Sequence, residues 1–147
     1  MAIDAGLLPL RSEITIRVLA MIPTSPDRLL RQLRDIAGPK NVLTGDRSTR
    51  RYRSGFRFGG GAAIAVVFPH SLLQQWQILE ACIAADAAVI TQASNTGLTG
   101  GSTPFGHDYD RPVVIVNTLR LDRIHTLGDS SKWFVCQGPR CISSRAY

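Results

Sequence analysis

Two apolar runs joined by one helical segment constrain the fold of this chain more than any other feature. Residues 62–68 read AAIAVVF and end at Pro69, and residues 87–92 read AAVITQ. Unbroken apolar runs of this length are typical of strands that are buried on both faces of a sheet. Between them, Ser71 and Gln74 form a capping box, which predicts the start of a helix. The strand, helix and strand predict a parallel β-α-β unit with a right-handed crossover.

The helix between these runs shows an apolar stripe that one acidic residue interrupts. Its members are Leu72, Leu73, Trp76, Leu79, Glu80 and Ile83. Their helical spacing predicts a helix, which we expect to pack on the sheet.

Further elements complete a small α+β domain. The sequence Ser25-Pro26-Asp27 has an N-cap, a first-turn proline and a first-turn acid, and Gly38-Pro39 ends the apolar pattern that follows, so a short helix is predicted. Residues 112–118 predict a third strand, and residues 133–136 a possible fourth. Residues 1–24 have no clear period and are interpreted as an N-terminal extension, with a strand at 14–19 as the alternative. The expected fold is a small mixed sheet with packed helices.

The amino-acid composition indicates what kind of partner this chain binds and in which cellular compartment it works. The formal charge of +6 favours an anionic partner, without choosing among phosphate, nucleic acid and lipid headgroups. The three cysteines, Cys82, Cys136 and Cys141, are too few for a disulfide framework and favour a reducing cytosol. Together with the scattered histidines, they give no metal-ligand spacing, so no metal ligand is predicted. No run approaches the ~20 apolar residues that cross a bilayer, and the chain is expected to be soluble and cytoplasmic.

The segment 45–61, GDRSTRRYRSGFRFGGG, supports two interpretations. Five arginines (47, 50, 51, 53 and 57) alternate with Tyr52, Phe56 and Phe58. Arginine beside aromatic side chains can bind single-stranded nucleic acid through charge and stacking, so a nucleic-acid-binding module is one alternative. The favoured interpretation is a solvated, irregular connector whose aromatic rings fold back on the core, because the spacing fits no regular face.

A glycine-rich loop follows the second strand of the predicted unit. Residues 92–104 read QASNTGLTGGSTP and contain no charged side chain. Ligands of parallel sheets bind at the carboxyl ends of strands, where this loop begins. Gly97, Gly100 and Gly101 allow positive φ and inward-turned N–H groups, and the serine and threonine hydroxyls add donors, so the loop suits a pyrophosphate. A plain surface connector is the other interpretation.

Two common phosphate motifs are excluded at this loop. A P-loop requires Gly-Lys-Ser/Thr followed by a helix, whereas this loop has no lysine and contains Pro104 and Gly106. The dinucleotide fingerprint G-x-G-x-x-G is also absent.

Three longer stretches carry a resemblance to a known family. They are YRSGFRFGGGAAIAVVFP, QASNTGLTGGSTP and DYDRPVVIVNTLRLDRIH. Together they resemble the N-terminal part of the quinone-dependent D-lactate dehydrogenases, flavoproteins of the p-cresol methylhydroxylase (vanillyl-alcohol oxidase) type. The resemblance spans residues 27–135 and implies that residues 25–135 are the first subdomain of an FAD-binding domain of this type. Residues 136–147 depart from the family pattern, so a truncated or frame-disrupted tail is expected there.

The resemblance implies a cofactor, substrates and site residues. The loop would be the pyrophosphate-binding turn of an FAD site, with the flavin-contacting positions at Ala93, Ser94, Asn95, Thr96, Gly97, Gly101 and Ser102. D-lactate would be oxidised to pyruvate and quinone would accept the electrons. Membrane association is implied only for the full-length family, at the cytoplasmic side of the inner membrane. No catalytic residue matches a position in this chain, and a second polypeptide could complement it. The resemblance implies no role in binding nucleic acid.

Overall fold

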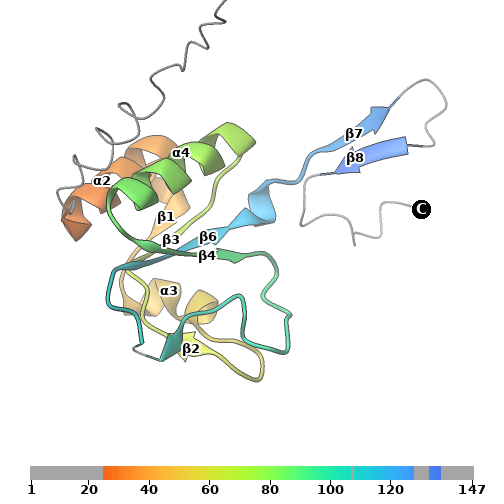
Figure 1. Ribbon diagram of the computed structural model, residues 1–147. Coiled ribbons are helices and arrows are strands. Elements are labelled where there is room, and N and C mark those ends of the chain that lie inside the picture. The colour runs from red at the N-terminus through yellow and green to blue at the C-terminus, as the bar shows by residue number, and fades with distance from the viewer. Residues whose placement is uncertain (1–24, 107, 128–132, 137–147) are drawn as a thin grey trace, which may run out of the picture.

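A four-stranded sheet lies between a layer of two helices and a layer of one short helix and loops. The computed structural model describes residues 25–106, 108–127 and 133–136. In spatial order the strands are β1 (Val42–Leu43), β3 (Ala65–Val67), β6 (Val113–Asn117) and β4 (Ala88–Gln92). Strands β3 and β4 run parallel to β6, and β1 is antiparallel to β3. Figure 1 shows the helical layer on one face of this sheet and the loop layer on the other.

Helix α2 (Pro26–Ala37) begins and ends where the sequence predicts. The hydroxyl of Ser25 accepts a hydrogen bond from the N–H of Arg28 at 3.4 Å, so it caps the helix. Leu29 and Leu33 are fully buried against the rest of the helical layer. Gly38, at φ 86°, ends the helix.

Helix α4 (Leu72–Ala84) connects β3 to β4 and confirms the predicted strand-helix-strand unit. The hydroxyl of Ser71 accepts from the N–H of Gln74 at 3.2 Å. The side-chain oxygen of Gln74 accepts from the N–H of His70 at 2.8 Å, one residue before the cap, so the predicted capping box is offset by one position.

Most of the apolar stripe of α4 does not face the sheet. Ile78 and Cys82 are fully buried against the sheet, whereas Leu79 of the stripe is half-buried. The other stripe residues are exposed: Leu72, Leu73, Trp76, Glu80 and Ile83. Ile78, Cys82 and Ala85 follow each other at i, i+4 and i+7, which is itself a helical stripe. Spacing alone could not separate the two faces, and the smaller residues allow the helix to approach the sheet closely.

Successive side chains of the central strands point to opposite faces of the sheet and so belong to two separate apolar clusters. Ala65 and Val67 of β3 and Val114 of β6 contact the helical layer. The residues between them, Val66 and Ile115, contact the α3 side together with other apolar groups. This alternation confirms that the strand predicted at 62–68, observed as β3, is buried on two faces, and the same holds for β6. The strand predicted as buried at 87–92 is different: β4 lies at the edge of the sheet, and before Gln92 its residues are half-buried or exposed.

The predicted irregular connector at 45–61 contains a regular helix, α3 (Asp46–Arg53). Thr49 is buried, and its hydroxyl donates to the carbonyl of Gly45 at 2.9 Å. The ring of Tyr52 meets the ring of Phe68 edge-on at 5.3 Å, whereas Phe56 and Phe58 are exposed. Thr49 and Tyr52 attach this helix to the rest of the domain. The arginines between them favour the helix, because arginine has good helix propensity. A search for an apolar stripe misses such a helix.

Short elements complete the structure. Two 3-10 helices, η1 (Pro39–Asn41) and η2 (Thr118–Arg120), follow α2 and β6. Strands β2 (Gly60–Gly61) and β5 (Phe105–Gly106) pair in parallel within the loop layer. The possible fourth strand is confirmed as β8 (Trp133–Cys136), but it pairs with β7 (Ile124–Leu127) in a separate hairpin.

The alternative strand at 14–19 and the tail at 137–147 lie outside the described residues. Among the residues that are described, no helix has the length and apolar character needed to cross a membrane.

Candidate functional site

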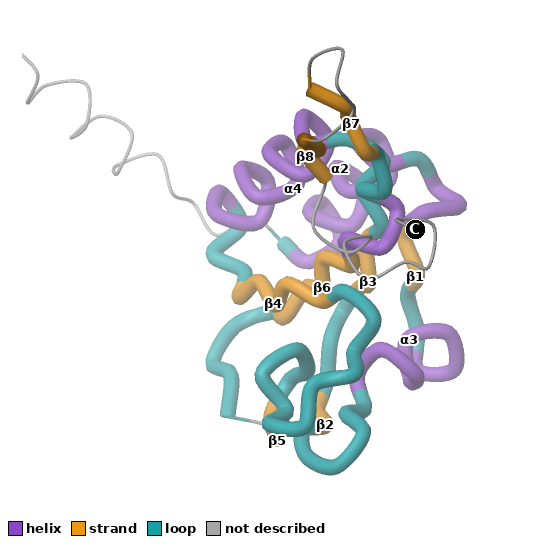
Figure 2. Tube along the Cα trace, turned by 90° about the vertical axis from the view of Figure 1, so that its right-hand side faces the viewer, coloured by secondary structure: helices purple, strands orange, loops and turns teal. Residues whose placement is uncertain are grey.

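The glycine-rich loop runs from the carboxyl end of β4 to β5, on the face of the sheet opposite α2 and α4. Figure 2 shows this loop in the same layer as α3 and the β2–β5 pair. Gln92 is the last residue of β4 and pairs with Asn117, the last residue of β6. The loop therefore starts where two parallel strands end side by side, as the sequence predicted.

A buried amide pair anchors the start of the loop. Gln92 and Asn117 are each 1% exposed, and the Asn117 side-chain N–H donates to the Gln92 side-chain oxygen at 3.1 Å. The Gln92 amide nitrogen donates to the carbonyls of Tyr52 and Ser102, both at 2.8 Å. The Gln92 side chain thus connects β4 to the end of α3 and to the far end of the loop. All its buried polar atoms are hydrogen-bonded.

A second amide holds the middle of the loop. Asn95 has a φ of 56°, in the left-handed region that asparagine tolerates better than most residues. Its side-chain nitrogen donates to the carbonyl of Ser54 at 2.8 Å, and its side-chain oxygen accepts from the hydroxyl of Ser102 at 2.8 Å. The side chains of Asn95 and Ser102 therefore hold the loop in shape and are not available to a ligand, and the main-chain carbonyl of Ser102 is bonded to Gln92.

Glycines bring the loop against segment 54–61. Gly59 and Gly100 have φ of 87° and 75°, and a Cβ on Gly100 would lie 3.0 Å from the carbonyl oxygen of Phe58. A Cβ on Gly59 would lie 2.1 Å from the hydroxyl of Thr103. The two backbones approach too closely for any side chain between them.

Three glycines of the loop allow positive φ, and only one adopts it. Gly100 is in the positive-φ region, whereas Gly97 and Gly101 are not. A Cβ on Gly97 would meet nothing within 4 Å, so Gly97 borders open space.

Four of the predicted site residues keep their hydrogen-bonding groups free. Within the described part of the chain, Ser94, Thr96, Gly97 and Gly101 form no hydrogen bond, and all four are exposed. Their N–H groups and two hydroxyls are uncommitted donors on a loop without charge. Such a set suits an anion with several acceptor oxygens, such as a diphosphate.

The structure therefore divides the seven predicted site residues into two groups. Ala93, Ser94, Thr96, Gly97 and Gly101 are exposed, whereas Asn95 and Ser102 are half-buried and bonded to each other. Sequence reasoning missed Gln92, Asn117 and the packing role of Gly59. A signal existed for the first two: each is a polar residue at the inward position that ends an apolar strand.

The shifted pKa values lie away from this loop. Cys82 is a free, buried cysteine, and burial raises the pKa of its thiol to about 11, which makes it an unreactive core group. The Arg111 guanidinium hydrogen-bonds to Asp110 and lowers the pKa of that carboxyl. Both groups of this pair are exposed and offer no special chemistry.

No protein-family model matches the chain. Among curated proteins, the quinone-dependent D-lactate dehydrogenase of Escherichia coli is 53% identical over 124 residues, which cover 84% of this chain and 22% of the relative. The enzyme of the same name from Haemophilus influenzae is 49% identical over 108 residues, or 74% of this chain and 19% of the relative. The chain thus spans about a fifth of the length of these relatives.

Solved structures share the fold at low sequence identity. Alkyldihydroxyacetonephosphate synthase matches with a TM-score of 0.62 at 15% identity, over 72% of this chain and 21% of the other. p-Cresol methylhydroxylase with bound substrate matches with a TM-score of 0.55 at 17% identity, over 69% of this chain and 20% of the other. The fold class inferred from the resemblance, the first subdomain of a p-cresol methylhydroxylase-type domain, is confirmed. The resemblance to the D-lactate dehydrogenases is confirmed by sequence, and the nucleic-acid alternative gains no support.

Proposed function

We propose that this chain, a homologue of part of the quinone-dependent D-lactate dehydrogenases, holds the diphosphate of FAD in its glycine-rich loop. The observation that carries the proposal is the set of free donors on Ser94, Thr96, Gly97 and Gly101, beside the open space at Gly97. The similarity in sequence to the dehydrogenases supports it. A diphosphate accepts several hydrogen bonds at once, and backbone N–H groups provide them without a lysine.

The anchored amides make this loop ready for its ligand. Gln92 fixes both ends of the loop and Asn95 fixes its middle, so the free N–H groups are ordered before a ligand arrives. Less conformational entropy is then lost on binding. The contribution of this chain is to bind and orient the cofactor.

The reaction that we propose for the whole enzyme is taken from the names of the similar proteins. FAD, when bound, supplies the two-electron acceptor for oxidation of D-lactate to pyruvate, and quinone receives the electrons afterwards. We assign no catalytic residue in this chain. D-lactate and quinone are proposed as substrates of the whole enzyme to which this part contributes.

The proposal is tested by titrating the chain with FAD and following flavin fluorescence. The Gly97→Val variant adds its side chain to open space, so the fold is retained while the ligand is excluded, and we expect the affinity for FAD to fall at least ~30-fold. Leu98→Val is the matched control, because it places the same side chain at the neighbouring exposed loop position, outside the seven, and removes no donor, so it should bind as the unchanged chain does.

Circular dichroism of each variant separates loss of binding from loss of fold. If Gly97→Val is folded and binds FAD with unchanged affinity, the loop is not the site. If the unchanged chain binds no FAD while its circular dichroism shows the folded structure, this chain does not hold the cofactor by itself.

A further inference from the structure

One face of helix α3 presents three guanidinium groups to a single open cavity. Arg47, Arg50 and Arg53 recur at i, i+3 and i+6 and all line this cavity of about 850 Å³. The other residues that line it are Asp46, Ser54, Gly60, Gly61 and Ala62. The seven residues proposed for FAD do not line it.

Arg53 is held rigidly at the cavity. Its guanidinium donates to the carbonyl of Gly61 at 3.0 Å and to the carboxylate of Asp46 at 3.1 Å. Only 17% of its side chain is exposed, and its Nε is buried without a hydrogen-bond partner, the one side-chain atom of this kind in the described part of the chain. A buried donor without a partner is energetically unfavourable, so the Arg53 side chain is constrained rather than fully satisfied.

Arg47 and Arg50 are uncommitted. Both are exposed, and within the described residues neither side chain forms an ion pair or a hydrogen bond. The cavity wall carries three arginines and one aspartate, and three minus one leaves a surplus charge of +2. Because Asp46 is already paired with Arg53, this surplus lies mainly on the two free guanidiniums.

We infer that this cavity binds a phosphate group carried by a small soluble molecule. A phosphate dianion matches the surplus of +2, and guanidinium groups bind phosphate oxygens in bidentate geometry. A cavity of about 850 Å³ has room for an organic carrier besides the phosphate itself. The site adjoins the glycine-rich loop, because Ser54 lines the cavity while its carbonyl accepts the Asn95 bond.

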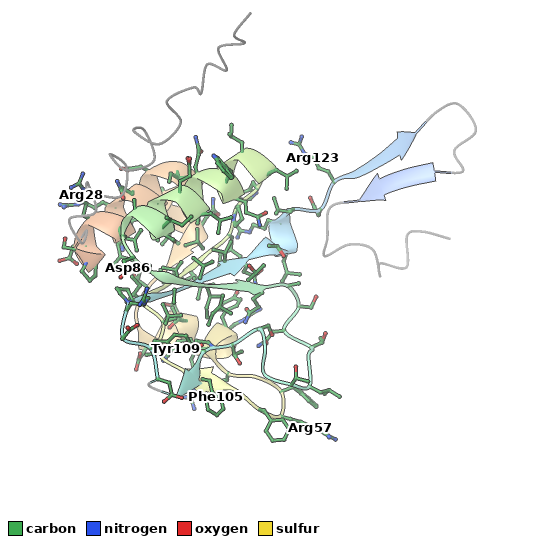
Figure 3. All side chains as sticks on the ribbon, viewed as in Figure 1. Arg28, Arg57, Asp86, Phe105, Tyr109 and Arg123 are labelled. Carbon is green, nitrogen blue, oxygen red and sulfur yellow. The ribbon has the colours of Figure 1, made fainter. Side chains whose placement is uncertain are left out.

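Calorimetric titration of the full chain with inorganic phosphate at low ionic strength tests the inference. We expect saturable binding that weakens at least ~10-fold in the double variant Arg47→Gln/Arg50→Gln. The matched control is Arg28→Gln/Arg31→Gln, which lowers the net charge equally on exposed positions of α2. Figure 3 shows Arg28 in the helical layer, across the sheet from α3, so this control should bind phosphate normally.

Other outcomes overturn the inference. Equal weakening in both double variants would mean a non-specific charge effect. Displacement of phosphate by FAD would make the cavity part of the cofactor site. A third outcome is that the chain binds no phosphate but binds phosphatidylglycerol vesicles, and that the Arg47→Gln/Arg50→Gln variant loses this vesicle binding. The arginines would then bind a lipid surface and not a small soluble molecule. The Gly97→Val variant should keep phosphate binding, so failure of the FAD proposal and failure of this one are distinguishable.

Discussion

The two faces of the sheet are built by different interactions. The face under α2 and α4 is closed by apolar side chains, of which Leu29, Leu33 and Ile78 are fully buried. The opposite face has a smaller apolar group around Val66 and Ile115, and beyond it the chain is held by amide hydrogen bonds and glycine contacts. Apolar packing tolerates exchange of one apolar side chain for another of similar volume, whereas a buried hydrogen bond requires its donor and acceptor at defined positions. The proposed site lies on the face that is held by such hydrogen bonds.

The largest effect is expected from the apolar face. Ile78→Ala removes a fully buried side chain and should lower the free energy of unfolding by about 3–4 kcal/mol, through lost burial and a cavity. Urea denaturation measures this. Ile83→Ala on the same helix is the control, since that side chain is 66% exposed and should cost less than about 0.5 kcal/mol. Equal effects of the two variants would contradict the observed orientation of α4.

A substitution on the polar face should lower both the free energy of unfolding and the affinity for FAD. Gln92→Leu leaves the carbonyls of Tyr52 and Ser102 and the amide of Asn117 without their partner, so we expect a loss of about 2–3 kcal/mol. FAD affinity should also fall by about tenfold, because the loop is no longer ordered in advance. Gln77→Leu, at an exposed position of α4, is the control for both measurements. A stable Gln92→Leu variant that binds FAD normally would show that the network does not position the loop.

Alkaline pH should weaken the apolar face specifically. The buried Cys82 thiol has a pKa of about 11 in the folded chain against 9.0 as the ordinary value, so the folded state holds this proton more tightly. Its contribution is therefore full below pH 9 and is lost as the pH rises toward 11, with about 1 kcal/mol lost at pH 10. Denaturation of the chain and of Cys82→Ala at pH 7.5 and 10 checks this. The difference in stability between the two proteins should shrink at pH 10, and a constant difference would argue against a buried thiol.

The smallest effect is expected at the start of α2. Ser25→Ala removes the hydroxyl that accepts from Arg28 and should cost about 0.5–1 kcal/mol. Ser25→Asp keeps an acceptor at the cap and should restore stability. Thermal denaturation of both variants measures the difference, and FAD binding should not change in either. A change in binding would mean that the two faces of the sheet are coupled.

The sequence predicted the apolar face better than the polar one, and the reason is physical. The long runs at 62–68 and 112–118 and the Ser25 cap depend on local patterns, and the structure confirms these elements. The orientation of α4 was not predictable, because two stripes of similar spacing compete and only contact with the sheet decides between them. Helix α3 was missed, because its contacts are single residues such as Thr49 and Tyr52.

The position of the proposed site was predictable and its construction was not. A charge-free loop after a buried strand indicated the place from residue types alone. The bonds from Gln92 to Tyr52 and from Asn95 to Ser54 join residues 40 and 41 positions apart, and no local pattern records such pairs. Whether Ser94, Thr96 and Gly97 contact FAD stays a prediction.

The close approach of Gly59 and Gly100 also restricts how this protein can vary in evolution. Each backbone occupies the place where the other would need a side chain, so neither segment can change its length or gain a side chain at the contact alone. An inherited insertion in 54–61 would require a compensating change in 95–103. Ser94, Thr96 and Gly97 make no such contact and can diverge independently, so selection could alter the ligand while the two segments keep a shared length.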